Sequence, residues 1–198
     1  MSSAKSSVEI QRDYVAAMGA ELGGQFHRLW NECSWLHLNW HQYELLFGSG
    51  PRRVEILNGA AGAFFRLVQD TFWEATLLHL SRLTDRPVVA GKDNLTLTRL
   101  PSLVDDTIRP RVEPLLADVL ARCDFARDWR NRHISHRDLG LALADSMVPP
   151  LAAASRTKVN EATEAIADLL NAVEAHYCHG ATTVYGMLDP VENAEAML

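Results

Sequence analysis

The fold is decided by residues 22–47, LGGQFHRLWNECSWLHLNWHQYELLF, in which large apolar side chains recur at intervals of four and three residues alternately. A stripe with this period covers one face of an α-helix, so the segment predicts a long amphipathic helix that extends back towards Val15. Gly19, Gly23 and Gly24 weaken the first part, where we expect a kink or a separate short helix. The stripe consists of Leu22, Phe26, Leu29, Cys33, Leu36, Trp40, Tyr43 and Phe47.

Further helical segments follow, and no strand-like alternation of useful length interrupts them. The sequence FGSGP at 47–51 ends the first helix, and proline and glycine mark the later loops. We therefore predict one all-α domain over residues 1–198, a four- to five-helix up-down bundle with its core at about 8–180 and a tail at 181–198 that is acidic from Asp189. The further helices are expected at about Arg52 to Thr84, Leu95 to Asp106, Arg111 into the next arginine-rich segment, and Arg156 to His179.

The second helix carries its own apolar stripe and should pack antiparallel to the first, because only a short loop joins them. His79 continues that stripe and is expected to be a hydrogen-bonded core histidine. Asp70 and Glu74 share another face, which we interpret as solvated. Residues 85–100 and 139–154 are predicted to be loops, with Asn94 as a candidate helix cap. The apolar stripe of this second helix consists of Leu57, Ala61, Phe65, Val68, Phe72 and Ala75.

Composition limits the class of protein. A net charge of -6 argues against a surface that is basic all over, so any nucleic-acid site should be local. Cys33, Cys123 and Cys178 form no CxxC pair and are expected to be small buried apolar residues. The sequence shows no signal or transit peptide and no apolar run long enough for a membrane span, so we expect a cytoplasmic protein.

The densest group of chemically active side chains is RCDFARDWRNRHISHRD, residues 122–138, with five arginines and two histidines. The buried stripe of the preceding helix continues to Arg130, and then to His133 and Arg137. An arginine on an apolar face needs a partner or a water-filled cleft, so we predict an open anion-binding cleft beside Arg130. If a carboxylate of the same bundle held Arg130, with no opening beside it, the whole proposal of an anion-binding site at Arg130 would be ruled out. The stripe itself is Leu116, Val119, Cys123 and Ala126.

The residues Arg130, Asn131, Ser135 and His136, within RNRHISH, resemble the signature of the HEPN superfamily of helical-bundle nucleotide-binding and ribonuclease domains. The position of the motif, after a long helix and before a final one, is also similar. Three segments further resemble the branch named after the abortive-infection AbiU proteins. They are LSRLTDRP (80–87), GKDNLTLTRL (91–100) and RDWRNRHISHRD (127–138).

The resemblance implies metal-independent RNA cleavage, in phage defence or a toxin system, in which a ribose 2′-hydroxyl attacks the adjacent phosphorus. His136 would be the general acid or base and Arg130 would hold the phosphate oxygens. Asn131 would orient one or the other by hydrogen bonding. No cofactor is implied, and no antitoxin is identified. Toxins silenced by a paired nucleotidyltransferase often carry a tyrosine where this chain has Asp138, so that regulation is not expected.

The resemblance also implies a homodimer with a shared cleft. His136 lies about 120° from Arg130 around the helix, so one unbroken helix cannot bring the two side chains together. Two chains that face each other can bring Arg130 of one copy to His136 of the other. His133 is an alternative to His136 as the working histidine. The residues expected to bind substrate are Arg127, His133 and Arg137.

Three alternatives stay open. A non-catalytic helical dimer would bind RNA, a nucleotide or a protein through the same arginines. A metal site could use His133, His136 and Asp138, or a second trio near the end of the last helix, although neither spacing matches an established signature. A structural protein would pair its arginines with acidic residues of a partner. The second trio is His176, Cys178 and His179.

Overall fold

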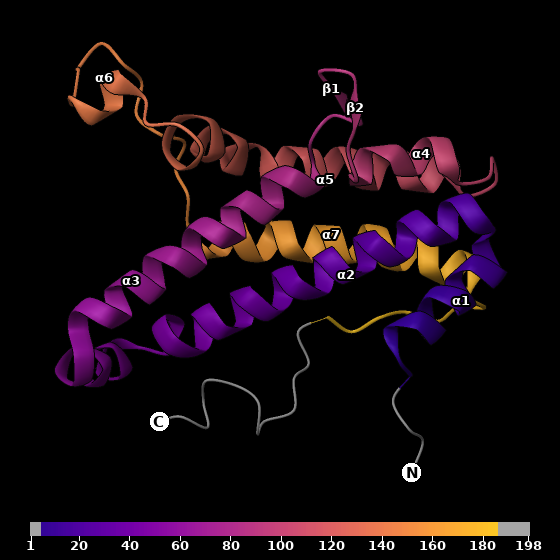
Figure 1. The fold of residues 1–198 in the computed structure, drawn as a ribbon, viewed down its shortest axis with the longest axis horizontal. Helices are drawn as coiled ribbons and strands as arrows, with labels where there is room; N and C mark the ends of the chain where they lie inside the picture. Colours follow the sequence, from indigo (N-terminus) through magenta and orange to yellow (C-terminus); the bar gives the residue numbers. More distant parts are fainter. Residues whose placement is uncertain (1–4, 186–198) are drawn as a thin grey trace.

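The computed structural model describes residues 5–185, which form an all-α bundle (Figure 1). Its four long helices are α2 (Ala20–Tyr43), α3 (Pro51–Leu83), α5 (Arg109–Trp129) and α7 (Arg156–Tyr177). A shorter helix, α1 (Ser7–Met18), packs on α2, while α5 packs on α7 and α3 lies against both α2 and α5. The predicted fold class is confirmed. The predicted acidic segment from Asp189 lies outside the described residues.

The expected break near the first glycines lies at Gly19, between α1 and α2. Gly19 has a φ of +83°, a conformation that side chains with a Cβ rarely adopt. Gly23, one turn into α2, lets the two helices approach closely, because an added Cβ would lie 2.5 Å from the Tyr14 carbonyl oxygen. The α2 stripe from Leu22 to Tyr43 is buried as predicted. Phe47 follows in a π-helical turn, η1 (Glu44–Gly48), and is only partly buried.

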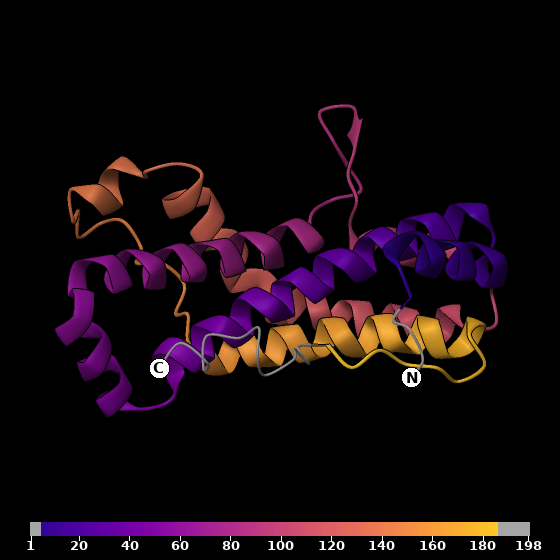
Figure 2. The same cartoon turned by 60° about the horizontal axis from the view of Figure 1, so that its bottom comes forward.

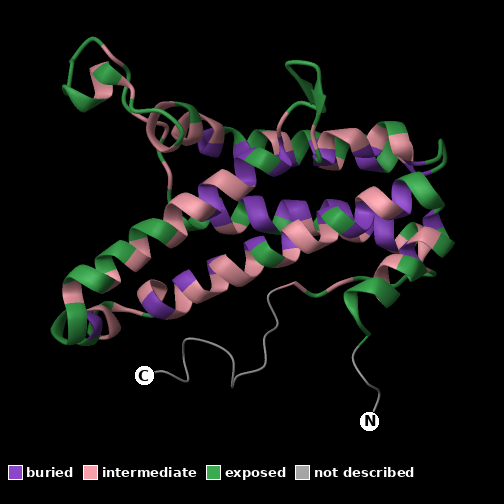
Figure 3. Cartoon of the chain, viewed as in Figure 1, coloured by how far each residue is buried: buried purple, intermediate pink, exposed green. Residues whose placement is uncertain are grey.

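Only the second half of α3 is buried in the core. Of its predicted stripe, Leu57 is buried, Ala61 is exposed and the others are half-buried, whereas Leu77 and Leu80 supply the core contacts. Ala61 has non-helical dihedrals (φ −163°, ψ 69°), so the helix is kinked there. The first half is therefore largely exposed at one end of the bundle (Figure 3). A periodic stripe identifies an apolar face but not whether another element covers it.

Two short strands interrupt the predicted loop after α3. They are β1 (Val88–Val89) and β2 (Lys92–Asp93), an antiparallel hairpin that stands away from the bundle in Figure 2. A 3-10 turn, η2 (Leu97–Arg99), and the short α4 (Leu100–Leu103) replace the helix expected from Leu95 to Asp106. Thr96 caps η2 through its side chain, whereas the expected cap, Asn94, donates to the Arg86 carbonyl and closes the hairpin.

The buried stripe of α5 is confirmed, and the helix then changes type. After Trp129 the chain continues as a π-helical turn, η3 (Arg130–Ile134), in which Ser135 N–H donates to the Arg130 carbonyl. The segment to α7 is loop apart from α6 (Leu139–Ala142), close to expectation. His79 differs from expectation: it is half-buried, burial lowers its pKa, and its Nδ1 has no hydrogen-bond partner among residues 5–185. Within these residues, no helix has the length and apolar character to cross a membrane.

Candidate functional site

The five arginines of residues 122–138 have different partners. Arg122 donates to Asp118 on its own helix, at 2.7 Å. Arg127 donates to the Thr84 carbonyl at the end of α3, also at 2.7 Å. Arg132 binds the loop before α7 through the carbonyls of Pro149 and Pro150, and it lies 3.3 Å from Asp128. These three arginines therefore stabilise the bundle and its loops.

Arg130 is held by a carboxylate of its own bundle. Its Nη1 lies 2.8 and 2.6 Å from the two oxygens of Asp85, and its Nε donates to Asn131 Oδ1 at 3.0 Å. The side chains of Arg130 and Asp85 are 25% and 23% exposed. Arg130 Nη2 has no hydrogen-bond partner among residues 5–185. The guanidinium expected to face an open cleft is thus largely satisfied internally, with one nitrogen left for another ligand.

Asp85 is itself fixed by the segment that follows the hairpin. Thr96 Oγ1 donates to the carbonyls of Leu83 and Asp85 at 2.9 and 2.8 Å, and Thr98 Oγ1 donates to Asp85 at 3.0 Å. Arg127 binds Thr84 from the opposite helix. The segments 80–87, 91–100 and 127–138 therefore meet at the C-terminal end of α3. Nothing in their spacing predicts this meeting, because it depends on long-range packing.

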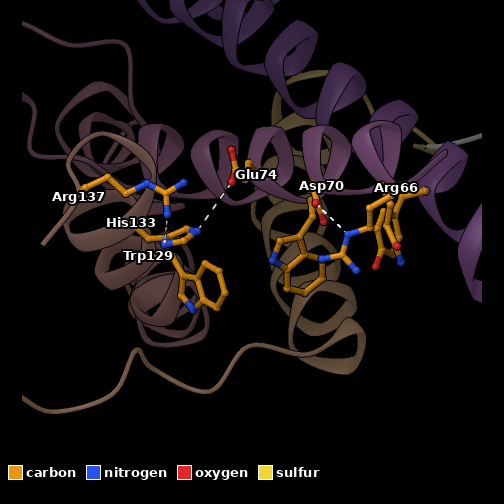
Figure 4. A pocket seen from close by; sticks show the side chains of 9 residues that line it. Arg66, Asp70, Glu74, Trp129, His133 and Arg137 are labelled. Atoms are coloured by element: carbon orange, nitrogen blue, oxygen red, sulfur yellow. Dashed lines mark hydrogen bonds and ion pairs between the residues drawn. The ribbon is translucent and has the colours of Figure 1, made fainter. Parts of the chain in front are cut away.

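His133 and Arg137 line a pocket of about 440 Å³ between α3 and the end of α5. His133 Nε2 lies 3.9 Å from Glu74 Oε1, and Arg137 Nη1 lies 3.4 Å from His133 Nδ1. Figure 4 shows Arg66, Asp70 and Glu74 along α3, with Arg137, His133 and Trp129 facing them. Arg66 is paired with Asp70 at 2.9 Å. Two of the three residues expected to bind substrate, His133 and Arg137, therefore line one pocket, and His133 lies beside Glu74 and not beside Arg130.

Aromatic rings form the rest of this pocket. They belong to Tyr43, Trp73 and Trp129. Trp129 meets Trp73 edge to face at 6.5 Å between ring centroids and meets His133 at 5.4 Å. Its indole N–H donates to the Ala152 carbonyl at 2.8 Å, which fixes the ring. Trp73 was not among the residues proposed from sequence, and Glu74 was interpreted there as solvated.

The π-helical turn explains why the side chains of Arg130 and His133 contact different parts of the structure. A π turn closes i to i+5 hydrogen bonds, so the 100° progression used for the sequence prediction no longer holds after Trp129. Arg130 reaches Asp85 at the end of α3, whereas His133 reaches Glu74, about three turns earlier on the same helix. π turns are frequent at functional sites, but no sequence period marks them.

The remaining candidates lie on the surface. Asn131, Ser135 and His136 are exposed, and His136 makes no hydrogen bond or ion pair with residues 5–185. The structure therefore does not bring His136 to Arg130 within one chain. Asp138 caps α6, and the hydrogen bond from Leu141 N–H is the main reason that its pKa is lowered. Arg132 lies 3.6 Å from Asp138, so this carboxylate has a cation beside it.

The histidine and cysteine trios considered as metal sites are not assembled as such. Within residues 5–185 no group of three or more His, Cys, Asp or Glu side chains has an arrangement suited to a metal ion. His176 instead pairs with Asp105, at 3.1 Å between Nε2 and Oδ2. That contact joins the end of α7 to the turn between α4 and α5.

Comparison with protein families matches the model of a HEPN family, described as AbiU2, to residues 19–197. This range includes α2 to α7 and all of the candidate residues described above. Comparisons with curated proteins and with solved structures gave no match.

Proposed function

We propose, from the fact that the chain belongs to the AbiU2 family of the HEPN superfamily, that it is a metal-independent endoribonuclease of phage defence or of a toxin system. The observation that supports this best is the family match over residues 19–197. Of the two residues that the chemistry needs, His136 is exposed and makes no hydrogen bond or ion pair within residues 5–185, and Arg130 is held by Asp85 with only Nη2 left for a ligand. One group is positioned and the other is available. We place this activity in the cytoplasm.

The chemistry assigns one step to each side chain. The ribose 2′-oxygen forms a bond to the adjacent phosphorus and the bond to the 5′-oxygen breaks, which leaves a cyclic phosphate and a free 5′-hydroxyl. One proton leaves the 2′-hydroxyl and one reaches the leaving 5′-oxygen. His136 carries out one of these transfers, since an imidazole exchanges protons near neutral pH, and water carries out the other. Arg130 Nη2 stabilises the charge on the phosphate oxygens, and Asn131 holds the Arg130 Nε.

A second copy of the chain would complete this site. Arg130 and His136 make no contact in one chain, so the histidine of one copy would act with the arginine of the other. Large apolar side chains are exposed on the first half of α3 and around α6, at the same end of the molecule (Figures 1 and 3). Exposed apolar groups of this kind commonly mark an interface. They are Ile56, Phe64, Leu67, Leu139, Leu143 and Met147.

One observation favours a second candidate function, a non-catalytic dimer that binds RNA, a nucleotide or a protein. The Asp85 carboxylate occupies Arg130 Nη1 with both oxygens and competes with a phosphate for the same guanidinium. A protein that only binds its ligand can function with Asp85 on Arg130, because it does not need to stabilise a transition state. A ribonuclease must act through Nη2 or displace Asp85 when RNA arrives.

Cleavage of RNA in the presence of EDTA separates the two functions. We expect the wild type to cleave and His136→Ala to be slower by at least about a hundredfold, because the variant lacks the proton-transfer group. The melting temperature should stay the same, since His136 is exposed. His179→Asn, at the exposed end of α7, is the matched control and should cleave as the wild type does.

Two other outcomes decide the remaining alternatives. RNA binding without cleavage, equal in wild type and His136→Ala, would replace the ribonuclease by the binding protein. Loss of cleavage in His133→Ala but not in His136→Ala would make His133 the working histidine and move the chemistry into the pocket beside Glu74.

A further inference from the structure

We infer that the pocket between α3 and η3 binds a single unpaired guanine base, with the phosphate of that nucleotide at Arg137. Its role in RNA cleavage rests on the proposed function, but binding can be measured without any cleavage. The pocket uses Trp73, Trp129, Glu74 and Arg137, of which only Arg137 was expected from sequence to bind substrate. Arg130 and His136 do not line it.

The indole rings supply the surface for a base. Trp73 and Trp129 are half-buried, and they meet edge to face, so a base can stack on one ring with the second ring at its edge. The Trp129 N–H is already bonded to Ala152, which keeps that ring fixed before any ligand arrives. Aromatic faces of this kind bind unpaired bases in single strands and cannot reach bases that are stacked within a duplex.

Glu74 selects the base. Its side chain is 43% exposed and accepts no hydrogen bond from residues 5–185, because His133 Nε2 is too distant at 3.9 Å. Two carboxylate oxygens side by side accept two adjacent N–H donors. Guanine presents such a pair on its Watson–Crick edge, at N1 and at the 2-amino group. Adenine and cytosine offer one amino group beside an acceptor nitrogen, and uracil offers one N–H between two carbonyls.

Arg137 supplies the cation for the phosphate. Among the charged residues of the pocket, Arg66 and Asp70 neutralise each other at 2.9 Å. Arg137 has no carboxylate within ion-pair distance in the described part of the chain, and its Nη1 lies 3.4 Å from His133 Nδ1. The pocket is thus left with one anion that accepts no hydrogen bond from residues 5–185, Glu74, which has the His133 ring 3.9 Å away, and one cation without a carboxylate partner there, Arg137. A guanine nucleotide has the complementary arrangement, N–H donors at the base and negative charge at the phosphate.

The pocket also lies next to the proposed catalytic residue in the chain. Arg137 directly follows His136, and His133 is on the preceding turn. A base held by Glu74 would place the sugar and phosphate of the same nucleotide near this turn. The proposed ribonuclease would therefore cleave beside an unpaired guanine.

Calorimetric titration of the full chain with the four nucleoside monophosphates tests the site. GMP should bind at least about tenfold more tightly than AMP, CMP or UMP, because each lost hydrogen bond to a charged group weakens binding by about that factor. Glu74→Gln should remove the preference for GMP, since an amide has only one acceptor oxygen. Arg137→Gln should weaken GMP binding several-fold and leave guanosine binding unchanged. Glu55→Gln, exposed on the same helix, should bind GMP as the wild type does.

The base site fails if the four nucleotides bind equally, if none binds at millimolar concentration, or if Glu74→Gln, folded by circular dichroism, binds GMP as tightly as the wild type. Cleavage assays keep this failure distinct from that of the proposed function. Glu74-dependent GMP binding without any RNA cleavage would retain the base site and remove the ribonuclease. Cleavage that shows no preference for guanine and is unchanged in Glu74→Gln would retain the ribonuclease and remove the base site.

Discussion

Asp85 is the residue on which the position of Arg130 depends, because its two oxygens bind the same guanidinium nitrogen at 2.6 and 2.8 Å. Asp85→Asn leaves a partly buried cation without its counter-ion, and we expect a loss of about 1–3 kcal/mol in the free energy of unfolding, between the values for exposed and buried pairs. Urea unfolding monitored by circular dichroism measures this loss.

Asp93→Asn is the control for this prediction. Asp93 is 80% exposed and pairs with Arg99 at the base of the hairpin, so its loss should change stability by less than about 0.5 kcal/mol. Equal effects of the two substitutions would show that the Asp85 pair contributes no more than a surface pair. Combining Asp85→Asn with Arg130→Gln should recover part of the loss, because the uncompensated charge is then also removed.

Residues near each other in sequence were assigned more successfully than residues distant in sequence. His133 and Arg137 are four positions apart, so the helical period alone predicts that they share a face. Asp85 lies 45 positions before Arg130, in a loop, and no period connects the two. Glu74 could be placed on a face of its helix but not opposite a particular neighbour. Partners of this kind are determined by how helices pack.

At the scale of elements, Gly23 sets how closely α1 and α2 approach. A Cβ at this position would lie 2.5 Å from the Tyr14 carbonyl oxygen and 2.7 Å from Val15 Cα, which are backbone atoms that cannot rotate away. Gly23→Ala should therefore destabilise the protein by about 1–3 kcal/mol, the usual cost of overpacking. Thermal unfolding of the purified variant measures this.

Gly24→Ala is the matched control on the same turn. A Cβ there has no neighbour within 4 Å, and alanine favours a helix over glycine, so Gly24→Ala should be stabilising by up to about 1 kcal/mol. Two alanine variants of equal stability would mean that α1 is free to move away from α2.

Helices whose apolar face is covered follow the sequence pattern closely, and those whose face is uncovered do not. The stripes of α2 and α5 and the break at Gly19 are where periodicity and glycine predict them. The predicted stripe of α3 is equally regular, yet only Leu57 of it is fully buried, and the helix is kinked at Ala61. The period of the sequence identifies the apolar face of a helix, but that face is buried only where another element packs on it. The π turns η1 and η3 have no period that a sequence could reveal.

For the whole molecule, the uncovered face of α3 leads to a prediction about assembly. Phe64 is 58% exposed, and Leu67 lies exposed one turn further along. If this face joins two copies, Phe64→Glu should convert a dimer to a monomer and reduce RNA cleavage in parallel, because a buried charge at an interface is unfavourable. Light scattering coupled to size-exclusion chromatography measures the molar mass of the wild type and of the variant.

Val8→Glu provides the comparison, since Val8 is equally exposed but lies on α1. That variant should keep the mass and the activity of the wild type. A wild type that is monomeric at micromolar concentration would contradict the shared site directly. A dimer insensitive to Phe64→Glu would place the interface on another face.

The junction at the end of α3 has a mechanical consequence. Thr96 and Thr98, which follow the protruding hairpin, bind the carbonyls of Leu83 and Asp85. Arg127 of α5 binds the Thr84 carbonyl between them, and the Asp85 carboxylate binds Arg130 of η3. The segment that follows the hairpin is therefore connected to Arg130 through Asp85. We expect a ligand that binds the hairpin and displaces this segment to shift Asp85, and with it the guanidinium of Arg130, without contacting either residue.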